Sequence, residues 1–134
     1  MINTVLFDLD GTLLPMDNAE FIKYYFSLLC KKVAPLGYDA DALVSAIWAG
    51  TADMGANDGS ELNEPVFWRK FTAVLGERVS ELRPIIEEFY SVDFNAARVV
   101  CGQNPALVSL VHELRERGVT VALATNPLFP AVAT

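Results

Sequence analysis

The chain has 134 residues, with 10 Lys and Arg against 17 Asp and Glu, and carries a formal net charge of −7 at pH 7. Hydrophobic residues make up 52% of the sequence and charged residues 20%, which excludes a disordered acidic tail and indicates a folded chain with a core. The excess of acid argues against a nucleic-acid partner, because binding to phosphates needs clustered Lys and Arg.

Three features favour a cytoplasmic location with no membrane partner. No apolar run approaches the roughly 20 residues of a membrane span. The N-terminus lacks a basic residue and turns acidic after a short apolar run, unlike a signal peptide. Cys30 and Cys101 lie far apart with no metal-binding spacing, which is typical of a reduced protein.

Residues 2–7 form a short apolar run and predict a β-strand that is buried on both faces, as in a parallel sheet. The run leads directly into Asp8-Leu9-Asp10-Gly11-Thr12. Gly11 permits a tight turn at this point. The sequence therefore predicts two carboxylates at the tip of a strand.

Residues 15–90 carry apolar side chains at helical spacing and predict a bundle of about four helices. The glycine-rich segment 50–60 predicts a loop between the second and third helices. The expected capping residues are Asp17 or Asn18, Asp39 or Asp41, and Asn63. The side chains expected to face inward are Phe21, Tyr25, Leu28, Leu29, Leu43, Val44, Ile47, Trp48, Phe67, Phe71, Val74, Leu75, Val79, Leu82, Ile86 and Phe89.

A helix and a second strand are predicted after the bundle. Asn104 and Pro105 are a capping residue and a first-turn proline, and Gly118 ends the helix. The expected buried stripe of this helix is Leu107, Leu110, Val111 and Leu114. Residues 119–124 predict an apolar strand that is parallel to the first, because the order without the bundle is β-α-β.

Parallel strands place their carboxyl ends at one edge of a sheet, where ligands bind. Asp8, Asp10, Thr125 and Asn126 follow the two predicted strands at that edge. Two neighbouring carboxylates repel each other, and a divalent cation relieves the repulsion. Hard oxygen ligands indicate Mg²⁺ with a phosphorylated substrate. One carboxylate can then act as a nucleophile on phosphorus and the other as a general acid and base.

The sequence resembles the haloacid dehalogenase superfamily in two motifs. The first is a hydrophobic strand followed by DxDGT, here Phe7-Asp8-Leu9-Asp10-Gly11-Thr12. The second is a strand ending in Ser or Thr, here Val121-Ala122-Leu123-Ala124-Thr125. A helical insert directly after the first motif is similar to the C1-type cap of the family.

The resemblance implies roles for five residues. Asp8 is the expected nucleophile and Mg²⁺ ligand, and Asp10 is the expected acid and base, with its backbone also reaching the metal. The Thr125 hydroxyl is expected to bind the transferring phosphoryl group. The backbone amides of Leu9 or Asn126 complete that cradle. An aspartate at the position of Asp10 favours phosphate-ester chemistry over cleavage of carbon–halogen bonds.

The implied fold is α/β: an incomplete Rossmann-like parallel-sheet core, residues 1–14 and 91–134, with an inserted four-helix cap, residues 15–90. The family also uses a cation and an acidic pair after the second motif, whereas no Lys, Arg or carboxylate follows Arg117 here. We therefore expect the chain to be the N-terminal part of a larger enzyme and to be inactive alone. Its expected partners are a small phosphorylated substrate and either the missing C-terminal segment or another copy of the chain.

The function that these features predict is a Mg²⁺-dependent phosphatase that hydrolyses a small phosphorylated metabolite through an aspartyl-phosphate. A phosphomutase of the same superfamily is an alternative, since it uses the same intermediate. A non-catalytic interaction module is a second alternative for the 134 residues. Outside the strand tips, ordinary surface or loop positions are expected for Lys23, Trp68, Arg69, Lys70, His112 and residues 53–58.

Overall fold

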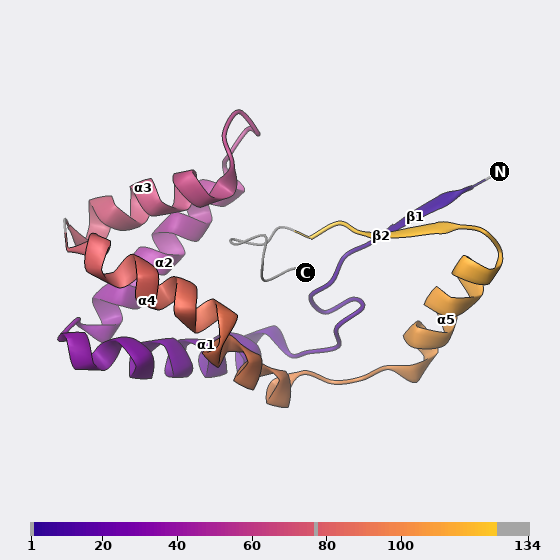
Figure 1. The fold of residues 1–134 in the computed structure, drawn as a ribbon, viewed down its shortest axis with the longest axis horizontal. Helices are drawn as coiled ribbons and strands as arrows, with labels where there is room; N and C mark the ends of the chain where they lie inside the picture. Colours follow the sequence, from indigo (N-terminus) through magenta and orange to yellow (C-terminus); the bar gives the residue numbers. More distant parts are fainter. Residues whose placement is uncertain (1, 77, 126–134) are drawn as a thin grey trace. The chain divides into compact units, whose positions relative to one another are not determined.

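The computed structural model describes residues 2–76 and 78–125 (Figure 1). The elements in chain order are β1 (Thr4–Phe7), α1 (Asn18–Val33), η1 (Ala34–Leu36), α2 (Ala40–Gly55), α3 (Asn63–Leu75), α4 (Val79–Ser91), η2 (Asp93–Val100), α5 (Pro105–Glu116) and β2 (Thr120–Leu123). The fold is therefore mostly helical with a small parallel sheet. None of the described helices is both long and apolar enough to cross a membrane.

The described residues form two compact units. Residues 2–24 and 96–125 make one of them, named here the strand unit. Residues 25–95 make the other, named here the helical unit. Helix α1 contributes to both, because the division falls between Tyr24 and Tyr25.

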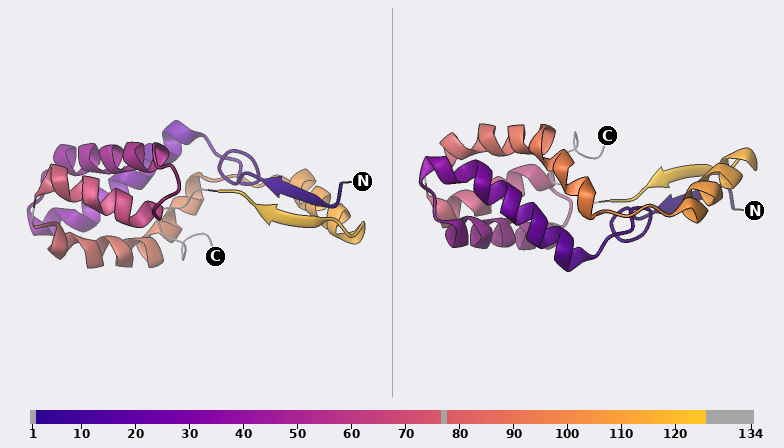
Figure 2. Two further views of the ribbon diagram at one scale, coloured as in Figure 1. Left: turned by 90° about the horizontal axis from the view of Figure 1, so that it is seen from above. Right: turned by 90° about the horizontal axis from the view of Figure 1, so that it is seen from below.

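The strand unit is built on the parallel pairing of β1 with β2, which confirms the predicted strand direction. Thr4 pairs with Thr120 and Phe7 with Leu123. The ladder extends by one bond past the strands, since the Ala124 amide donates to the Phe7 carbonyl at 2.8 Å. Helix α5 packs against β2. Figure 2 shows the two strands running side by side with α5 leading into β2.

The strands and α5 are not buried as the sequence predicted. Leu6 of β1 is 65% exposed and Leu123 of β2 is 48% exposed. No residue of α5 is fully buried, and Leu110 of its predicted stripe is exposed. A two-stranded sheet with a single helix offers too little surface to cover both of its faces, so the apolar periodicity is present without the burial.

The helical unit holds nearly all of the core of the described chain. Its buried apolar residues are Tyr25, Leu29, Val33, Leu43, Ala46, Ile47, Met54, Val66, Phe67, Trp68, Phe71, Val79, Leu82, Ile86 and Phe89. The rings of Phe67 and Phe71 are stacked at 5.3 Å, and Trp68 meets Phe71 edge-on at 5.4 Å. Edge-on and offset arrangements of this kind add to the free energy gained by burying the rings.

The inward faces of the helices were predicted with mixed success. All four residues predicted for α4 are buried. Trp48 and Val74, in contrast, are 47% and 46% exposed. Trp48 contacts Phe26 edge-on at 5.7 Å, so its ring packs on the surface of α1 instead of entering the core.

Helix α2 continues through the segment that the sequence assigned to a loop. It ends at Gly55, and Gly50 is a buried residue inside it. A Cβ atom at Gly50 would lie 2.6 Å from Cδ2 of Phe67 on α3. Gly50 is therefore a site of close approach between the two helices and not a helix terminator.

Helix capping follows the sequence at three of the four expected places. Asp17 Oδ1 accepts from the Glu20 amide, Asp39 Oδ1 from the Ala42 amide and Asn104 Oδ1 from the Ala106 amide, at 2.9, 2.8 and 3.1 Å. Asn63 is instead the first residue of α3, and Leu62 precedes it without a side-chain cap. The Asn63 side chain accepts from Asn57 Nδ2 at 3.0 Å and so ties down the preceding loop.

Candidate functional site

The two predicted motifs come together at one end of the sheet. Asp8 directly follows β1, and Thr125 lies two residues beyond β2. The bond from the Ala124 amide to the Phe7 carbonyl holds these two chain ends side by side. Asp8 is exposed and Thr125 is half-buried. Asn126, the remaining residue of the predicted site at β2, lies outside the described residues.

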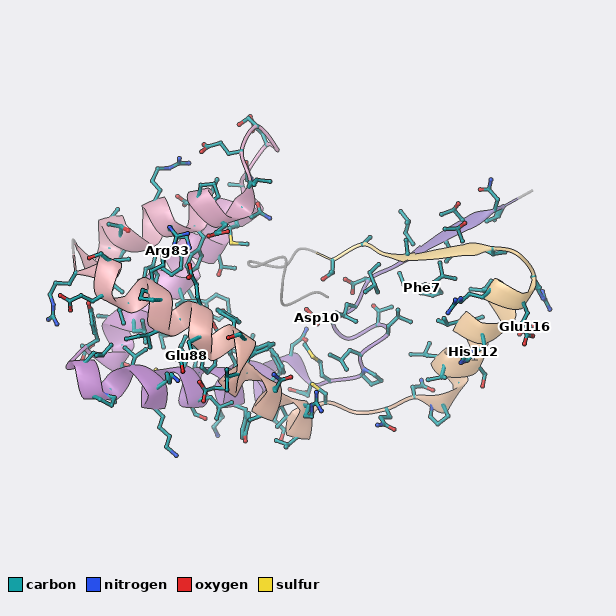
Figure 3. All side chains as sticks on the ribbon, viewed as in Figure 1. Phe7, Asp10, Arg83, Glu88, His112 and Glu116 are labelled. Atoms are coloured by element: carbon teal, nitrogen blue, oxygen red, sulfur yellow. The ribbon has the colours of Figure 1, made fainter. Side chains whose placement is uncertain are left out.

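The segment after Asp8 is a compact, hydrogen-bonded turn. The Leu9 carbonyl accepts from the amides of Thr12 and Leu14, at 3.2 and 2.8 Å, and the Gly11 amide donates to the Leu14 carbonyl at 2.9 Å. Gly11 has a φ of 75°, in the left-handed region that favours glycine. Figure 3 shows Asp10 in this loop beyond β1.

The hydroxyl group of Thr12 donates to Oδ2 of Asp8 at 3.0 Å. From the sequence, Thr12 was predicted only as part of the motif, without a role of its own. The contact could have been predicted from the spacing, because Thr12 follows Asp8 by four residues across a turn that contains a glycine. Such turns fold the chain back, so that side chains at both ends meet.

The pKa of the Asp10 carboxyl is raised above its usual value, first by burial and then by the negative charge of Asp8. The tip of β1 thus concentrates negative charge. This is the electrostatic setting that a bound cation relieves.

A third chain segment of the strand unit pairs with the residues that follow the turn. The Gly102 amide donates to the Pro15 carbonyl, and Met16 pairs with Cys101 in an antiparallel bridge. Burial and the charge of Asp10 raise the pKa of the Cys101 thiol. A raised thiol pKa leaves little thiolate at neutral pH, which argues against Cys101 as a nucleophile.

The donors at the strand tip are of the right kind for Mg²⁺. Carboxylate oxygens are hard ligands, and Mg²⁺ is commonly held by one or two carboxylates with water and substrate phosphate. Asp8 and Asp10 supply two carboxylates, and no cluster of three His, Cys, Asp or Glu side chains occurs among the described residues. Two carboxylates of this kind fit part of a Mg²⁺ site.

Two basic side chains of the helical unit that could have faced a substrate are paired with neighbouring carboxylates. Arg69 makes two hydrogen bonds to Glu61, both at 3.0 Å, and Lys70 lies 3.5 Å from Asp53. Trp68 is buried, so it is neither the surface residue that the sequence predicted nor free to meet a ligand. His112 is exposed on α5, as expected.

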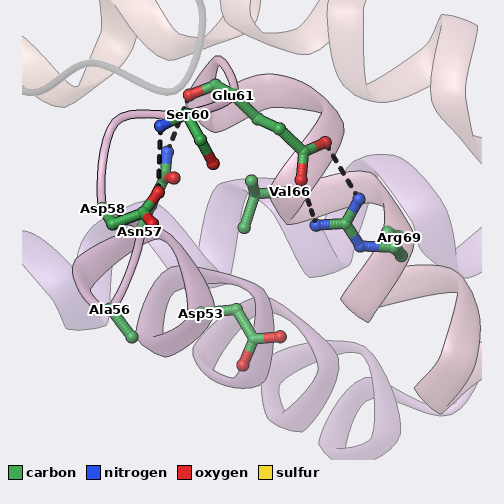
Figure 4. A pocket seen from close by; sticks show the side chains of 8 residues that line it. All are labelled: Asp53, Ala56, Asn57, Asp58, Ser60, Glu61, Val66 and Arg69. Carbon is green, nitrogen blue, oxygen red and sulfur yellow. Dashed lines mark hydrogen bonds and ion pairs between the residues drawn. The ribbon is translucent and has the colours of Figure 1, made fainter.

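A surface pocket of about 420 Å³ lies over the loop between α2 and α3 (Figure 4). It is lined by Asp53, Ala56, Asn57, Asp58, Ser60, Glu61, Val66 and Arg69. Asp53 comes from α2 itself, so residues 53–58 are not one loop as predicted. With three carboxylates and an arginine already paired to Glu61, the pocket opposes the binding of an anion such as a phosphate ester.

Comparison of the chain with protein-family models finds no match, and no curated protein or solved structure matches it either. The resemblance to the haloacid dehalogenase superfamily therefore remains a prediction from the two sequence motifs.

Proposed function

We propose that this sequence carries the nucleophile half of a phosphatase active site, with Asp8 as the nucleophile and Asp10 as the acid and base. The observation that supports it best is the placement of Asp8, Asp10 and Thr125 at adjacent ends of two parallel strands. Ligands of open α/β sheets bind at this edge. The proposed substrate is a small phosphate monoester.

The raised pKa of Asp10 supports its assignment as the acid. A carboxyl group that holds its proton more strongly than usual is better able to donate it to a leaving group near neutral pH. Burial and the neighbouring charge of Asp8 cause the shift, and both follow from the turn. Proton transfer from a positioned group contributes about 10²–10⁴-fold to a rate.

The proposed reaction has two displacements at phosphorus. A carboxylate oxygen of Asp8 forms a bond to phosphorus while the ester P–O bond breaks, and the departing alkoxide takes the proton of Asp10. Asp10, now ionised, then removes a proton from water as the water oxygen attacks phosphorus. The bond from phosphorus to Asp8 breaks, and inorganic phosphate leaves with Asp8 restored.

Thr125 and backbone amides would bind the phosphoryl oxygens. Thr125 follows Ala124, whose amide donates to the Phe7 carbonyl, and its hydroxyl can donate one hydrogen bond. The amides of Leu9 and Asn126 are proposed as further donors. Mg²⁺ would be held by Asp8 and Asp10 and, when bound, would neutralise charge on the phosphoryl group.

The fold proposed for the enzyme is a Rossmann-like core with an inserted helical cap. The pairing of β1 with β2 through α5 supports the core, and the independent core of the helical unit supports the insertion. A lysine or arginine and further carboxylates are needed to complete the site. They are proposed to come from outside the described residues.

The test is phosphate release from an aryl phosphate by the natural protein that carries this sequence. Asp8→Asn should abolish turnover, and Asp10→Asn should slow it strongly while still allowing phosphorylation of Asp8. Asp58→Asn makes the same chemical change on an exposed loop and should leave turnover unchanged. Near-normal turnover by Asp8→Asn would contradict the covalent mechanism.

The same protein tests the metal requirement. Chelation should abolish turnover, and Mg²⁺ should restore it far better than Ca²⁺, which takes more ligands at longer distances. Equal rates with and without a divalent cation would contradict the proposed Mg²⁺ site.

A further inference from the structure

The contact between Thr12 and Asp8 fixes one oxygen of the proposed nucleophile. The Thr12 hydroxyl donates to Oδ2 of Asp8 at 3.0 Å. An unrestrained carboxylate turns about its χ2 bond and presents either oxygen to an incoming group. A hydrogen bond from a hydroxyl to a charged carboxylate is stronger than one between neutral groups and so limits this rotation.

The backbone of the turn holds Thr12 over Asp8 independently of its side chain. The Thr12 amide donates to the Leu9 carbonyl at 3.2 Å, and the Leu13 amide donates to the Asp8 carbonyl at 3.4 Å. Gly11, at a φ of 75°, provides the reversal between them. The main chain thus sets the position of Thr12, and these backbone hydrogen bonds do not depend on its hydroxyl.

We propose that Thr12 is a positioning residue that aligns Asp8 for attack. This inference rests on the proposed function of Asp8. With Oδ2 engaged by the Thr12 hydroxyl, Oδ1 is the oxygen that forms the bond to phosphorus. An ionised carboxylate oxygen accepts more than one hydrogen bond or ligand, so Oδ2 can accept the hydroxyl and still bind a cation.

The expected effect of losing the hydroxyl lies in the phosphorylation step. Misplacement of a reacting group by about 1 Å can cost about 100-fold in rate. Thr12→Val removes the donor and keeps the β-branched shape, whereas Thr12→Ser keeps the donor and loses only the methyl group. Thr12 is exposed, so neither change opens a cavity in the core.

The experiment uses the natural protein that carries this sequence, with an aryl phosphate as the substrate. Thr12→Val should lower kcat by about 10–100-fold with KM nearly unchanged. Single-turnover quenching and mass measurement of phosphorylated Asp8 should place the loss in phosphorylation. Thr12→Ser should retain kcat within about threefold, since the hydroxyl donor remains.

Two results overturn the assignment: wild-type kcat in Thr12→Val, or an equal loss in Thr12→Ser. Thermal unfolding of both variants identifies a loss of kcat that comes from a loss of folding. If Thr12→Val does not fold, the kcat of Thr12→Ser decides whether Thr12 positions Asp8. Asp8→Asn separates this inference from the proposed function. Full turnover in Asp8→Asn refutes the nucleophile itself, whereas loss of turnover there with normal turnover in Thr12→Val refutes only the role of Thr12.

Discussion

The ring of Phe67 on α3 lies directly against the backbone of Gly50 on α2, so that a Cβ atom at Gly50 would come within 2.6 Å of Cδ2 and 2.8 Å of Cε2. Nonbonded carbon atoms do not come this close, so a side chain at position 50 must push the ring away. Phe67 is buried and stacked on Phe71, and it has little room to move. The α2–α3 contact therefore depends on glycine at this one position.

Gly50→Ala is expected to destabilise the helical unit. Overpacking of a core typically costs about 1–3 kcal/mol, and it outweighs the gain of up to about 1 kcal/mol from replacing a helical glycine by alanine. Chemical unfolding followed by circular dichroism measures the change. Gly55→Ala is the matched control, because no atom lies within 4 Å of its Cβ position. The prediction is wrong if both variants have the same stability.

The helical unit is also expected to lose stability in alkali through Tyr25 and Tyr90. Their hydroxyl groups lie 2.6 Å apart, and burial raises the pKa of both, that of Tyr25 well above its usual value. A phenol that ionises less readily when folded contributes stability below its unfolded pKa of about 10, and this contribution is lost as the pH rises through the folded value. Helix content should therefore fall as these phenols ionise.

The measurement is ultraviolet absorbance of phenolate together with circular dichroism during a titration above pH 10. The double variant Tyr25→Phe, Tyr90→Phe should keep its helices to higher pH, because no buried phenol remains in that pair. Replacing both hydroxyls at once avoids leaving one of them buried without its partner. Unfolding of this variant at the same pH as the wild type would exclude the tyrosine pair as the cause.

The carboxyl of Asp10 is expected to destabilise the strand unit at neutral pH. The pKa of this carboxyl is raised in the folded chain. The carboxyl therefore contributes stability to the folded state at pH values below its unfolded pKa of about 3.9, and this stability is lost as the pH rises through the folded pKa. Asp10→Asn should consequently raise the melting temperature at pH 7 but not at pH 3. Asp58→Asn should give no rise, because the Asp58 carboxylate accepts a bond of 2.9 Å from the Ser60 amide.

Addition of Mg²⁺ extends this test to the proposed metal site. A ligand that binds only the folded state raises the melting temperature. The rise should be smaller in Asp8→Asn than in the wild type, since Asp8 is the proposed carboxylate ligand. An equal rise in both proteins would show that the ion acts elsewhere.

The 134-residue chain expressed by itself is expected to be inactive and to self-associate. Leu6, Val108 and Leu123 leave apolar surface exposed on the strand unit. Neither strand has the charged residue or proline that commonly protects a sheet edge. Light scattering during size exclusion and phosphate release from an aryl phosphate measure the two properties. A monomer with sustained turnover would contradict both expectations.

Sequence periodicity predicted those parts of the fold that depend on one element at a time. Val79, Leu82, Ile86 and Phe89 of α4 all meet the core because a single helical face determines their direction. The parallel pairing of β1 and β2 likewise follows from the order of the elements. The position of Asp8 at a strand tip needed only the end of the apolar run.

Features that depend on two elements escaped prediction. Gly50 was predicted to end a helix from the residues of its own segment. The close approach of the Phe67 ring on the next helix shows why a glycine is needed there. The apolar stripe of α5, with Leu110 exposed, was predicted correctly in period but not in burial, because burial depends on what lies opposite. The bond from Thr12 to Asp8 similarly requires the geometry of the whole turn.

The pairing of Thr4 with Thr120 joins two strands that lie about 116 residues apart in the chain. During synthesis β1 must therefore wait for its partner strand. At about 5–20 residues per second, β1 leaves the ribosome roughly 6–23 s before β2. The helical unit, whose core lies within residues 25–95, has ample time to fold in that interval. The apolar strand β1 has no partner strand during this interval, so nascent chains on crowded ribosomes are most vulnerable to aggregation at Thr4–Phe7.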